Sequence, residues 1–442
     1  MDSIILFLEG RKMNNKNNKN LTLVAGLALF SMFFGAGNLI FPPYLGFITS
    51  NHWIVSTIGF LITGVGIVML GVIATTKSGG SINTLSDKVS PIFSKIFGTA
   101  IILCIGPGFA IPRTAATSYE IIKNSLYPNF NAVICSVLFF FVVFLFVVKP
   151  SDIIDRIGKY LTPALLLVLF VIIIKGVFTP IGQTTRNSVE NTFSLSFQEG
   201  YQTMDALAAL IFTTIVISTF MSKGVNETKE LNKLTIKAAL IAGIGLCIVY
   251  GGLLYVGATA STLDFANLSR TEILTKITYL LLGNTGNIVL SLAILLACLT
   301  TAIGLLSSSS QYFYDLCNEK INYMFFVIIF TIFSAYFAIK GVDSIVIISG
   351  PVLTALYPIS ILLIVTEFFK DKIKYRGFYF GAILGAFYPT ILNILSIFNI
   401  DIDSAKLLFL NISKSFEAFI WIIPALVLGI LFTIIEKIIK RA

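Results

Sequence analysis

Asp205 is the residue of this chain whose chemistry stands out most, because its carboxylate falls inside a long apolar stretch. That stretch is interrupted by polar residues and glycine in Glu199-Gly200-Tyr201-Gln202-Thr203-Met204-Asp205-Ala206-Leu207. A carboxylate in such a place is costly to bury and usually faces a cavity or a partner. It can accept an ammonium group, coordinate Na⁺ or carry a proton. The alternative is a structural ion pair with Arg113, the other charge deep in an apolar run.

A second interruption near the start of the chain reads Gly35-Ala36-Gly37-Asn38 and is followed by a pair of prolines. Where a helix breaks, the freed N–H groups that begin its second half bind anions, and the freed carbonyls that end its first half bind cations. We therefore expect the amides from Ala36 to Asn38 to hold a carboxylate and the carbonyls from Ser31 to Phe34 to hold an ion. The alternative is a glycine kink made for close helix packing.

Two further motifs carry oxygen or charge into apolar runs. Thr300 and Thr301 follow Ala297 closely, and their hydroxyls together with a backbone carbonyl suit Na⁺. The alternative is that each threonine bonds a carbonyl of its own helix. Arg113 follows the irregular run Gly106-Pro107-Gly108, and it either lines a pathway or braces one.

The amino-acid composition indicates which kind of secondary structure positions these residues. Of 442 residues, 56% are hydrophobic and only 12% are charged, about half the charged share of a soluble protein. Continuous apolar runs indicate membrane helices of about 20 residues. The composition therefore argues against a soluble enzyme, a disordered chain, a disulfide scaffold and a β-barrel. The one histidine, His52, excludes a His-based metal site and a Ser-His-Asp triad, and the five dispersed cysteines favour buried, inert thiols.

We expect an all-α integral membrane protein with about twelve transmembrane helices. The expected segments are 21–49, 53–75, 95–122, 130–148, 160–181, 199–221, 234–257, 286–311, 322–340, 343–368, 377–399 and 415–437. The stretch 259–285 is expected to form a short amphipathic helix on the external surface, either capping a pathway or packing as an ordinary loop helix. Residues 1–12 show no signal peptide, and either Met1 or Met13 is the start.

Basic residues set the expected orientation. The chain carries a net charge of +9 and has 31 lysines and arginines, of which 22 fall in the loops and ends on the side of the N-terminus. We expect both termini in the cytoplasm.

The two interrupted helices are the first and the sixth, as expected of a five-plus-five inverted repeat with broken helices one and six. The expected parts are a cytoplasmic tail (1–20), a first repeat (21–182), a second repeat (183–368) and two additional helices (369–442).

The stretches Phe33-Phe34-Gly35-Ala36-Gly37-Asn38-Leu39-Ile40-Phe41-Pro42-Pro43 and Gly200-Tyr201-Gln202-Thr203-Met204-Asp205-Ala206-Leu207-Ala208-Ala209-Leu210 resemble those of the bacterial branched-chain amino acid transport carriers, the LIVCS cation symporters. The run 111–114 is also similar to that family, and the resemblance covers the chain after residue 20. More distantly, helices one and eight are similar to those of the sodium-coupled leucine and neurotransmitter symporters.

The distant resemblance implies roles for individual residues. A Na⁺ site would use the carbonyls of Ser31, Phe34 and Ala297 and the hydroxyls of Thr300 and Thr301. The amides of Ala36 and Gly37 would hold the substrate carboxylate, Thr203 and Asp205 would meet its ammonium group, and Asn38 and Thr203 would touch a second ion. An acidic residue, Asp205, stands where the distant family has a small hydroxyl.

The family resemblance implies a Na⁺-driven symporter that imports leucine, isoleucine and valine across the cytoplasmic (inner) membrane by alternating access. We expect an apolar pocket that includes Phe33, Ile111 and Ile303, and only loose selectivity among the three amino acids. No enzyme chemistry and no cofactor beyond the coupling ion is expected, nor any nucleic-acid partner. The alternatives are proton coupling through Asp205, a substrate-gated channel, which would not drive uphill accumulation, and a membrane-embedded enzyme.

Overall fold

A computed structural model describes residues 20–148, 152–184, 189–265, 267–388, 390–392 and 418–440. Every regular element of these residues is a helix. Seven of their helical stretches are long and apolar enough to cross a membrane, and four shorter apolar helices accompany them. The prediction of an all-α membrane fold is therefore confirmed.

The helices follow the predicted segments in order. The first half of the chain forms Asn20–Phe33, α2 (Ala36–Thr49), α3 (Trp53–Leu61), α4 (Ile67–Lys77), α5 (Ile82–Ser86), α6 (Pro91–Leu103), α7 (Ala110–Ser125), α8 (Ala132–Val148) and α9 (Asp152–Phe178). The second half forms α10 (Thr192–Glu199), α11 (Asp205–Ser222), α12 (Thr228–Thr259), α13 (Arg270–Leu316), α14 (Tyr323–Ala338), α15 (Val342–Phe368), α16 (Arg376–Ala386) and α19 (Ile422–Ile439). Parts of the predicted segments 377–399 and 415–437 lie outside the described residues.

Both expected breaks are present. The first helix stops at Phe33, Phe34 and Gly35 are non-helical, and α2 begins at Ala36. The sixth helix starts earlier than predicted, at Thr192, and passes through a 3₁₀ turn, Gly200–Thr203. Met204 then takes a left-handed backbone conformation, with φ of 62°, before α11 begins at Asp205. A non-glycine residue rarely adopts that conformation, so the chain direction changes sharply at this point.

The expected surface helix between the seventh and eighth spans forms the first part of α13. Gly283, with φ of 69°, separates it from the long second part. A capping box between Ser269 and Glu272 starts the helix, which satisfies the first free N–H groups. Ile273, Leu274, Ile277 and Leu281 are buried, whereas Leu280 is exposed.

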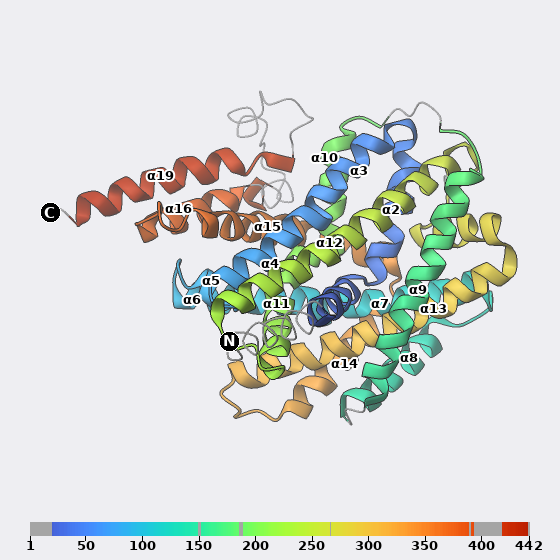
Figure 1. Ribbon diagram of the computed structural model, residues 1–442, viewed down its shortest axis with the longest axis horizontal. Helices are drawn as coiled ribbons and strands as arrows, with labels where there is room; N and C mark the ends of the chain where they lie inside the picture. The colour runs from blue at the N-terminus through green and yellow to red at the C-terminus, as the bar shows by residue number, and fades with distance from the viewer. Residues whose placement is uncertain are drawn as a thin grey trace, which may run out of the picture.

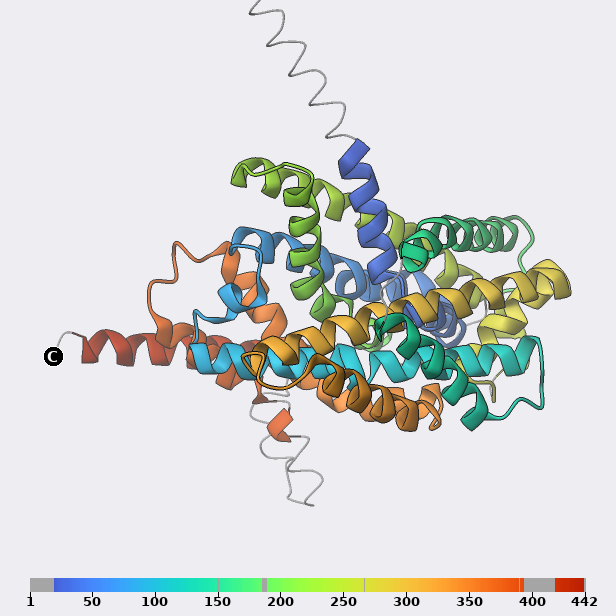
Figure 2. The same ribbon diagram turned by 90° about the horizontal axis from the view of Figure 1, so that it is seen from below.

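α16 and α19 pack side by side at one end of the molecule, away from the two broken helices (Figures 1 and 2). Glycines allow this close approach: a Cβ atom on Gly381 would lie 2.3 Å from the carbonyl oxygen of Leu428, and one on Gly385 would lie 2.3 Å from the backbone of Pro424. Helices in membranes commonly pack through such small residues.

The remaining helices surround the two breaks. α12 packs along α2, and α13 runs along α7 (Figure 2). α2 and α7 end at the membrane face where α10 and α15 begin. We call this the Arg270 face, because Arg270 lies there, and we call the opposite face, where α4 and α15 end, the Lys88 face.

Candidate functional site

A pocket lies where the two interrupted helices resume. Its lining comes from both breaks and from α7, η3 (Cys104–Gly108) and α13. The lining residues are Met32, Phe33, Gly35, Ala36, Gly37, Asn38, Ile105, Ala110, Arg113, Thr114, Thr203, Met204, Asp205, Ala208, Phe212, Thr301 and Leu305. Residues far apart in sequence that were each predicted to be functional therefore share one pocket.

Asp205 begins α11 and belongs to a buried hydrogen-bond network. Its Oδ2 accepts a hydrogen bond of 2.5 Å from Asn38 Nδ2 of α2 and one of 3.3 Å from the Tyr250 hydroxyl of α12. Asn38 also donates to the Tyr250 oxygen. The three side chains join the resumption points of both broken helices to a third helix, so this network fixes the geometry of the pocket.

Thr203 closes the 3₁₀ turn that precedes Asp205. Its hydroxyl donates to the carbonyl of Gly200 (2.9 Å) and accepts from the backbone N–H of Asp205 (3.3 Å). This arrangement satisfies one free N–H at the start of α11, as a capping side chain does. Thr203 therefore holds the start of that helix in addition to lining the pocket.

Arg113 reaches the same pocket from α7 and is only 3% exposed. Its Nη1 donates to the carbonyl oxygen of Gln202 at 2.6 Å, and its guanidinium lies over the Phe41 ring at 5.4 Å. A Cβ atom on Gly37 would lie 2.8 Å from Nη2. Among the described residues no carboxylate pairs with it, so the ion pair with Asp205 considered from sequence does not form.

Thr301 of α13 lies beside the first break. The methyl carbon of Thr301 would be 3.9 Å from a Cβ on Gly35, and Thr301 lines the pocket. The hydroxyl of Thr300 donates to the carbonyl of Ala297 at 3.0 Å, as in the alternative considered from sequence. Phe34 ends the preceding helix, where its N–H donates to Phe30, and Ser31 lies one turn earlier. Of the expected ion ligands on α13, Thr301 thus lies near the break, whereas the Thr300 hydroxyl is bonded within its own helix.

Two predicted pocket residues lie outside the lining. Ile111 and Ile303 are both buried, but neither borders the pocket. Side chains three or four positions apart share a helix face. Ala110, Arg113 and Thr114 line the pocket from one face of α7, and Ile111, about 100° around the helix from Ala110, lies at the flank of that face. Thr301 and Leu305 share a face of α13 in the same way, and Ile303, midway between them, does not.

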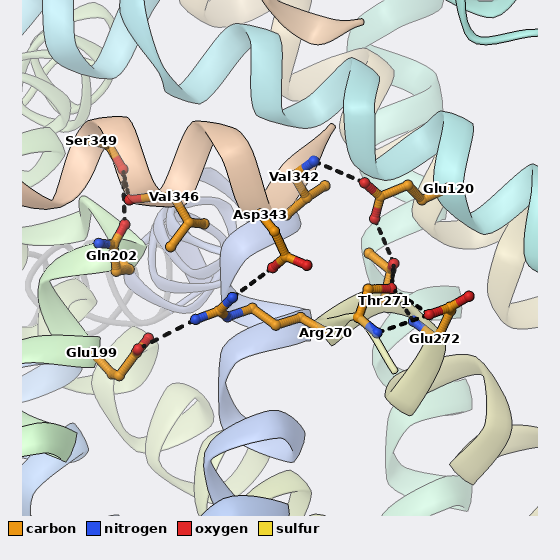
Figure 3. A network of polar contacts seen from close by, with 11 residues as sticks. Glu120, Glu199, Gln202, Arg270, Thr271, Glu272, Val342, Asp343, Val346 and Ser349 are labelled. Carbon is orange, nitrogen blue, oxygen red and sulfur yellow. Dashed lines mark hydrogen bonds and ion pairs between the residues drawn. The ribbon is translucent and has the colours of Figure 1, made fainter. Parts of the chain in front are cut away.

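On the Arg270 face, Arg270 is the centre of an ion cluster (Figure 3). Arg270 Nη1 lies 2.6 Å from Asp343 of α15, and Nη2 lies 3.5 Å from Glu199 of α10. The guanidinium is 4.3 Å from the centre of the Tyr44 ring and 5.7 Å from that of Phe41. The start of α13 thus bridges α2, α10 and α15.

Glu120, at the end of α7, adds hydrogen bonds beside the same ion cluster (Figure 3). Its two oxygens accept from the Thr271 hydroxyl (2.5 Å) and from the backbone N–H of Val342 (2.8 Å). Both donors stand next to members of the Arg270 cluster. The outer ends of α7, α13 and α15 are therefore held together by hydrogen bonds as well as by charge.

Sequence reasoning missed Tyr250, Arg270 and Asp343. A tyrosine in an apolar helix and charges near helix ends are ordinary features, so their types carry no signal. Only Glu199 offered one, because it opens the polar run that leads to Asp205.

Comparisons with known proteins agree with this architecture. The sequence model of the family described as branched-chain amino acid transport protein matches residues 18–439. Branched-chain amino acid permease BraB of Bacillus subtilis is 38% identical over 92% of this chain and 93% of its own length. Branched-chain amino acid permease BrnQ of the same organism is 35% identical over 95% of this chain and 97% of its own length.

Solved structures share the fold. The inward-facing conformation of Mhp1 superimposes with a TM-score of 0.62 at 13% identity, covering 94% of this chain and 91% of that one. A closed conformation of Mhp1, a nucleobase-cation-symport-1 family transporter with bromovinylhydantoin bound, gives 0.61 at 12% identity, covering 95% and 93%. The fold is thus the five-plus-five transporter fold, and the protein is a multi-pass membrane transporter rather than an enzyme. Since the family model and these relatives match nearly its whole length, the chain belongs to the branched-chain amino acid transport protein family.

Proposed function

We propose that this protein is a Na⁺-coupled symporter that imports leucine, isoleucine and valine across the cytoplasmic membrane by alternating access. The observation that carries this proposal is the pocket at the two helix breaks. It combines the uncapped N-terminus of α2, one buried cation and one buried anion with apolar side chains and a few amide and hydroxyl groups. Its relatives named as branched-chain amino acid permeases support the substrate class.

The amino acid backbone would be bound at the breaks. The first N–H groups of α2, at Ala36 and Gly37, donate no hydrogen bond to a capping side chain and would hold the carboxylate. Asp205 would accept the ammonium group, with Thr203 beside it.

The aliphatic side chain of the substrate would lie against the apolar part of the wall. Phe33, Ile105, Phe212 and Leu305 supply that wall. One methylene more or less in such a pocket changes binding by about 1–3 kcal/mol. The three branched amino acids would therefore all be carried, and polar side chains would be excluded by the cost of burial.

The coupling ion would bind beside Thr301 at the first break. Helix carbonyls freed by a break coordinate Na⁺ in transporters of this architecture, and hydroxyl and carbonyl oxygens are suitable ligands for hard cations. The ligands proposed are the carbonyls of Ser31, Phe34 and Ala297 and the hydroxyls of Thr300 and Thr301, with Asn38 near a second ion. No other cofactor is proposed.

The conformation described here closes the Arg270 face. Met32 and Phe33 precede the first break, and Phe212 lies two turns into α11, so the apolar lining extends toward the Lys88 face. We propose that the Arg270 face is external and that both termini are cytoplasmic, which agrees with 22 of the 31 basic residues lying on the N-terminal side. Transport would alternate this state with one in which the Arg270 cluster is open.

Uptake of labelled leucine into proteoliposomes tests the proposal. Accumulation above equilibrium is expected under an inward Na⁺ gradient without a pH gradient. Accumulation driven only by a pH gradient would instead favour proton coupling, for which Asp205 is the candidate carrier because it is the buried carboxylate of the pocket. Uptake that only equilibrates would indicate a channel, and no uptake of any branched amino acid would refute the substrate assignment.

A further inference from the structure

Arg113 is a buried cation that forms no ion pair with a carboxylate of the described residues. Its side chain is 3% exposed, and no carboxylate of the described residues pairs with it. An uncompensated charge at such depth is strongly unfavourable. A site that keeps one is suited to a ligand that brings the opposite charge.

Asp205, the anion of the pocket, forms no hydrogen bond with Arg113, because the hydrogen bonds of the two side chains lead to different partners. Asp205 Oδ2 accepts from Asn38 and from Tyr250, whereas Arg113 Nη1 donates to the carbonyl of Gln202. Asp205 and Arg113 thus line one pocket with opposite charges and separate partners. A zwitterion carries the complementary pair of charges.

The guanidinium is held in a fixed orientation. Gln202 lies in the turn that interrupts the sixth helix, and its side-chain oxygen accepts from Ser349 of α15 at 3.0 Å. Because Nη1 is anchored on the Gln202 carbonyl, the Nη2 side of the group is directed past Gly37. Arg113 is therefore positioned by the second break while it faces the first.

Gly37 brings the guanidinium and the α2 N-terminus to one place. Any side chain at this position would begin 2.8 Å from Nη2, so glycine leaves that space open. Gly35, which precedes the first turn of α2, provides no capping side chain. The N–H groups and the guanidinium are both donors, so an anion is the group that satisfies both.

We propose that Arg113 binds the substrate carboxylate directly, together with the first amides of α2. The inference rests on the proposed function and adds to it a residue that decides substrate class. Asp205 takes the ammonium group on the other side. A free carboxylate then becomes a requirement, because an amine lacking it leaves the cation of Arg113 buried without a counter-ion.

The test compares leucine with leucinol, which keeps the side chain and amine but replaces the carboxylate by a hydroxymethyl group. Each competes against labelled leucine in proteoliposomes containing the wild-type protein, Arg113→Gln or Arg113→Lys. Binding to the purified proteins is measured separately by the shift in thermal unfolding that each ligand causes. Arg376→Gln, at the exposed start of α16, is the matched control.

The wild-type protein and Arg376→Gln are expected to prefer leucine strongly. Loss of a charged hydrogen-bonding partner weakens binding by about tenfold to a hundredfold. We expect Arg113→Gln to bind leucine more weakly by that factor but to bind leucinol as the wild-type protein does. The preference for leucine over leucinol should therefore disappear. Arg113→Lys keeps the charge without the planar fork and should fall between.

Three results would overturn the inference. The first is an unchanged preference for leucine over leucinol in Arg113→Gln, and the second is an equal loss for both ligands, since a bracing residue would act on both alike. The third result applies if Arg113→Gln does not fold. In that case, an unchanged preference of Arg113→Lys for leucine over leucinol would overturn the inference. By contrast, a wild-type protein that neither binds nor transports leucine would refute the proposed function itself.

Discussion

Asp205 connects the pocket's chemistry to its structure, because the carboxylate that would meet the ammonium group also accepts hydrogen bonds from Asn38 and Tyr250. A buried carboxylate with two donors is held in position, and an ammonium ligand completes its coordination. The residue therefore contributes to binding and to the joining of α2, α11 and α12. Substituting Asp205 itself, or its partner Tyr250, separates these two contributions.

Asp205→Asn should abolish concentrative leucine uptake or raise its KM by at least about tenfold, because a charge-assisted hydrogen bond to the ammonium group contributes about 1.5–3 kcal/mol. Tyr250→Phe keeps the carboxylate charge but removes the 3.3 Å bond to Asp205 and the oxygen to which Asn38 donates, so each lost bond should cost only about 0.5–1.5 kcal/mol. Initial rates of labelled leucine uptake measure both. Normal KM in Asp205→Asn would show that the ammonium group binds elsewhere.

Thr301→Ala should raise the Na⁺ concentration needed for half-maximal leucine uptake, because it removes a proposed oxygen ligand beside the first break. At saturating Na⁺ the leucine KM should change little. Thr331→Ala is the matched control: this threonine of α14 bonds the carbonyl of Val327 within its own helix and does not line the pocket. Unchanged Na⁺ dependence in Thr301→Ala would exclude this ion site.

Helices α10, α13 and α15 meet at Arg270, so closure of this face depends on contacts between separate elements. Glu199 and Arg270 side chains are each 15% exposed, whereas Asp343 is 45% exposed. Exposed ion pairs contribute little, and breaking a buried one is costly. Glu199 is therefore the partner whose loss should matter most.

Glu199→Gln should shift the protein toward the state that is open at the Arg270 face. If the ion pair contributes about 1–3 kcal/mol to closure, the ratio of open to closed protein should rise by a factor of about 5–150. The reporter is a cysteine in place of Ala110, which lines the pocket, in a background lacking the five native cysteines. An impermeant thiol reagent added to the Arg270 side should label it faster. Glu319→Gln, at an exposed residue between α13 and α14, should leave the labelling rate unchanged, and an equally slow rate in Glu199→Gln would contradict the gating role.

Gly381→Leu should separate α16 from α19, because even a Cβ atom there would lie 2.3 Å from the Leu428 carbonyl oxygen. Overpacking of this kind costs about 1–3 kcal/mol or more, so the unfolding temperature in detergent should fall. The leucine KM of the folded fraction should not change, since neither helix lines the pocket. Gly304→Ala is the control, because a Cβ there meets nothing within 4 Å.

The molecule as a whole has an ion cluster at each end of α15. Asp343 pairs with Arg270 at its start, and Glu367 pairs with Lys88 and Lys370 at its end. Glu367 is fully buried, so the Lys88 face is also held by a desolvated charge. One helix thus takes part in closing both sides of the protein.

Reporter fusions test how the molecule is placed in the membrane. A reporter that is active only in the cytoplasm should work when fused after Ala442, and one that is active only outside should work when inserted at Gly341, between α14 and α15. The expectation follows from the excess of lysine and arginine on the N-terminal side. The reverse pattern would invert the assignment of the two faces.

Much of the fold was accessible from sequence, because each membrane helix is a long apolar run and the breaks are exceptions within such runs. Gly35 and Asp205 were identifiable for that reason. Ile111 and Ile303 were predicted to line the pocket but lie outside its lining. Packing decides which face each helix turns toward the pocket, and the sequence of a helix that is apolar all round does not reveal that face. Tyr250 and Arg270 acquire their roles from contacts between distant segments, and residue type alone does not encode these.

Phe41 lies along α2 between Gly37, which Arg113 approaches, and Tyr44, which Arg270 covers, and its ring touches both guanidinium groups. The layer between the pocket and the Arg270 face is therefore thin. A membrane potential of 100 mV is worth about 2.3 kcal/mol per elementary charge that crosses the whole membrane. A charge that passes Phe41 would gain the part of this energy that falls across the thin layer, so the voltage dependence of uptake should include a step at that ring.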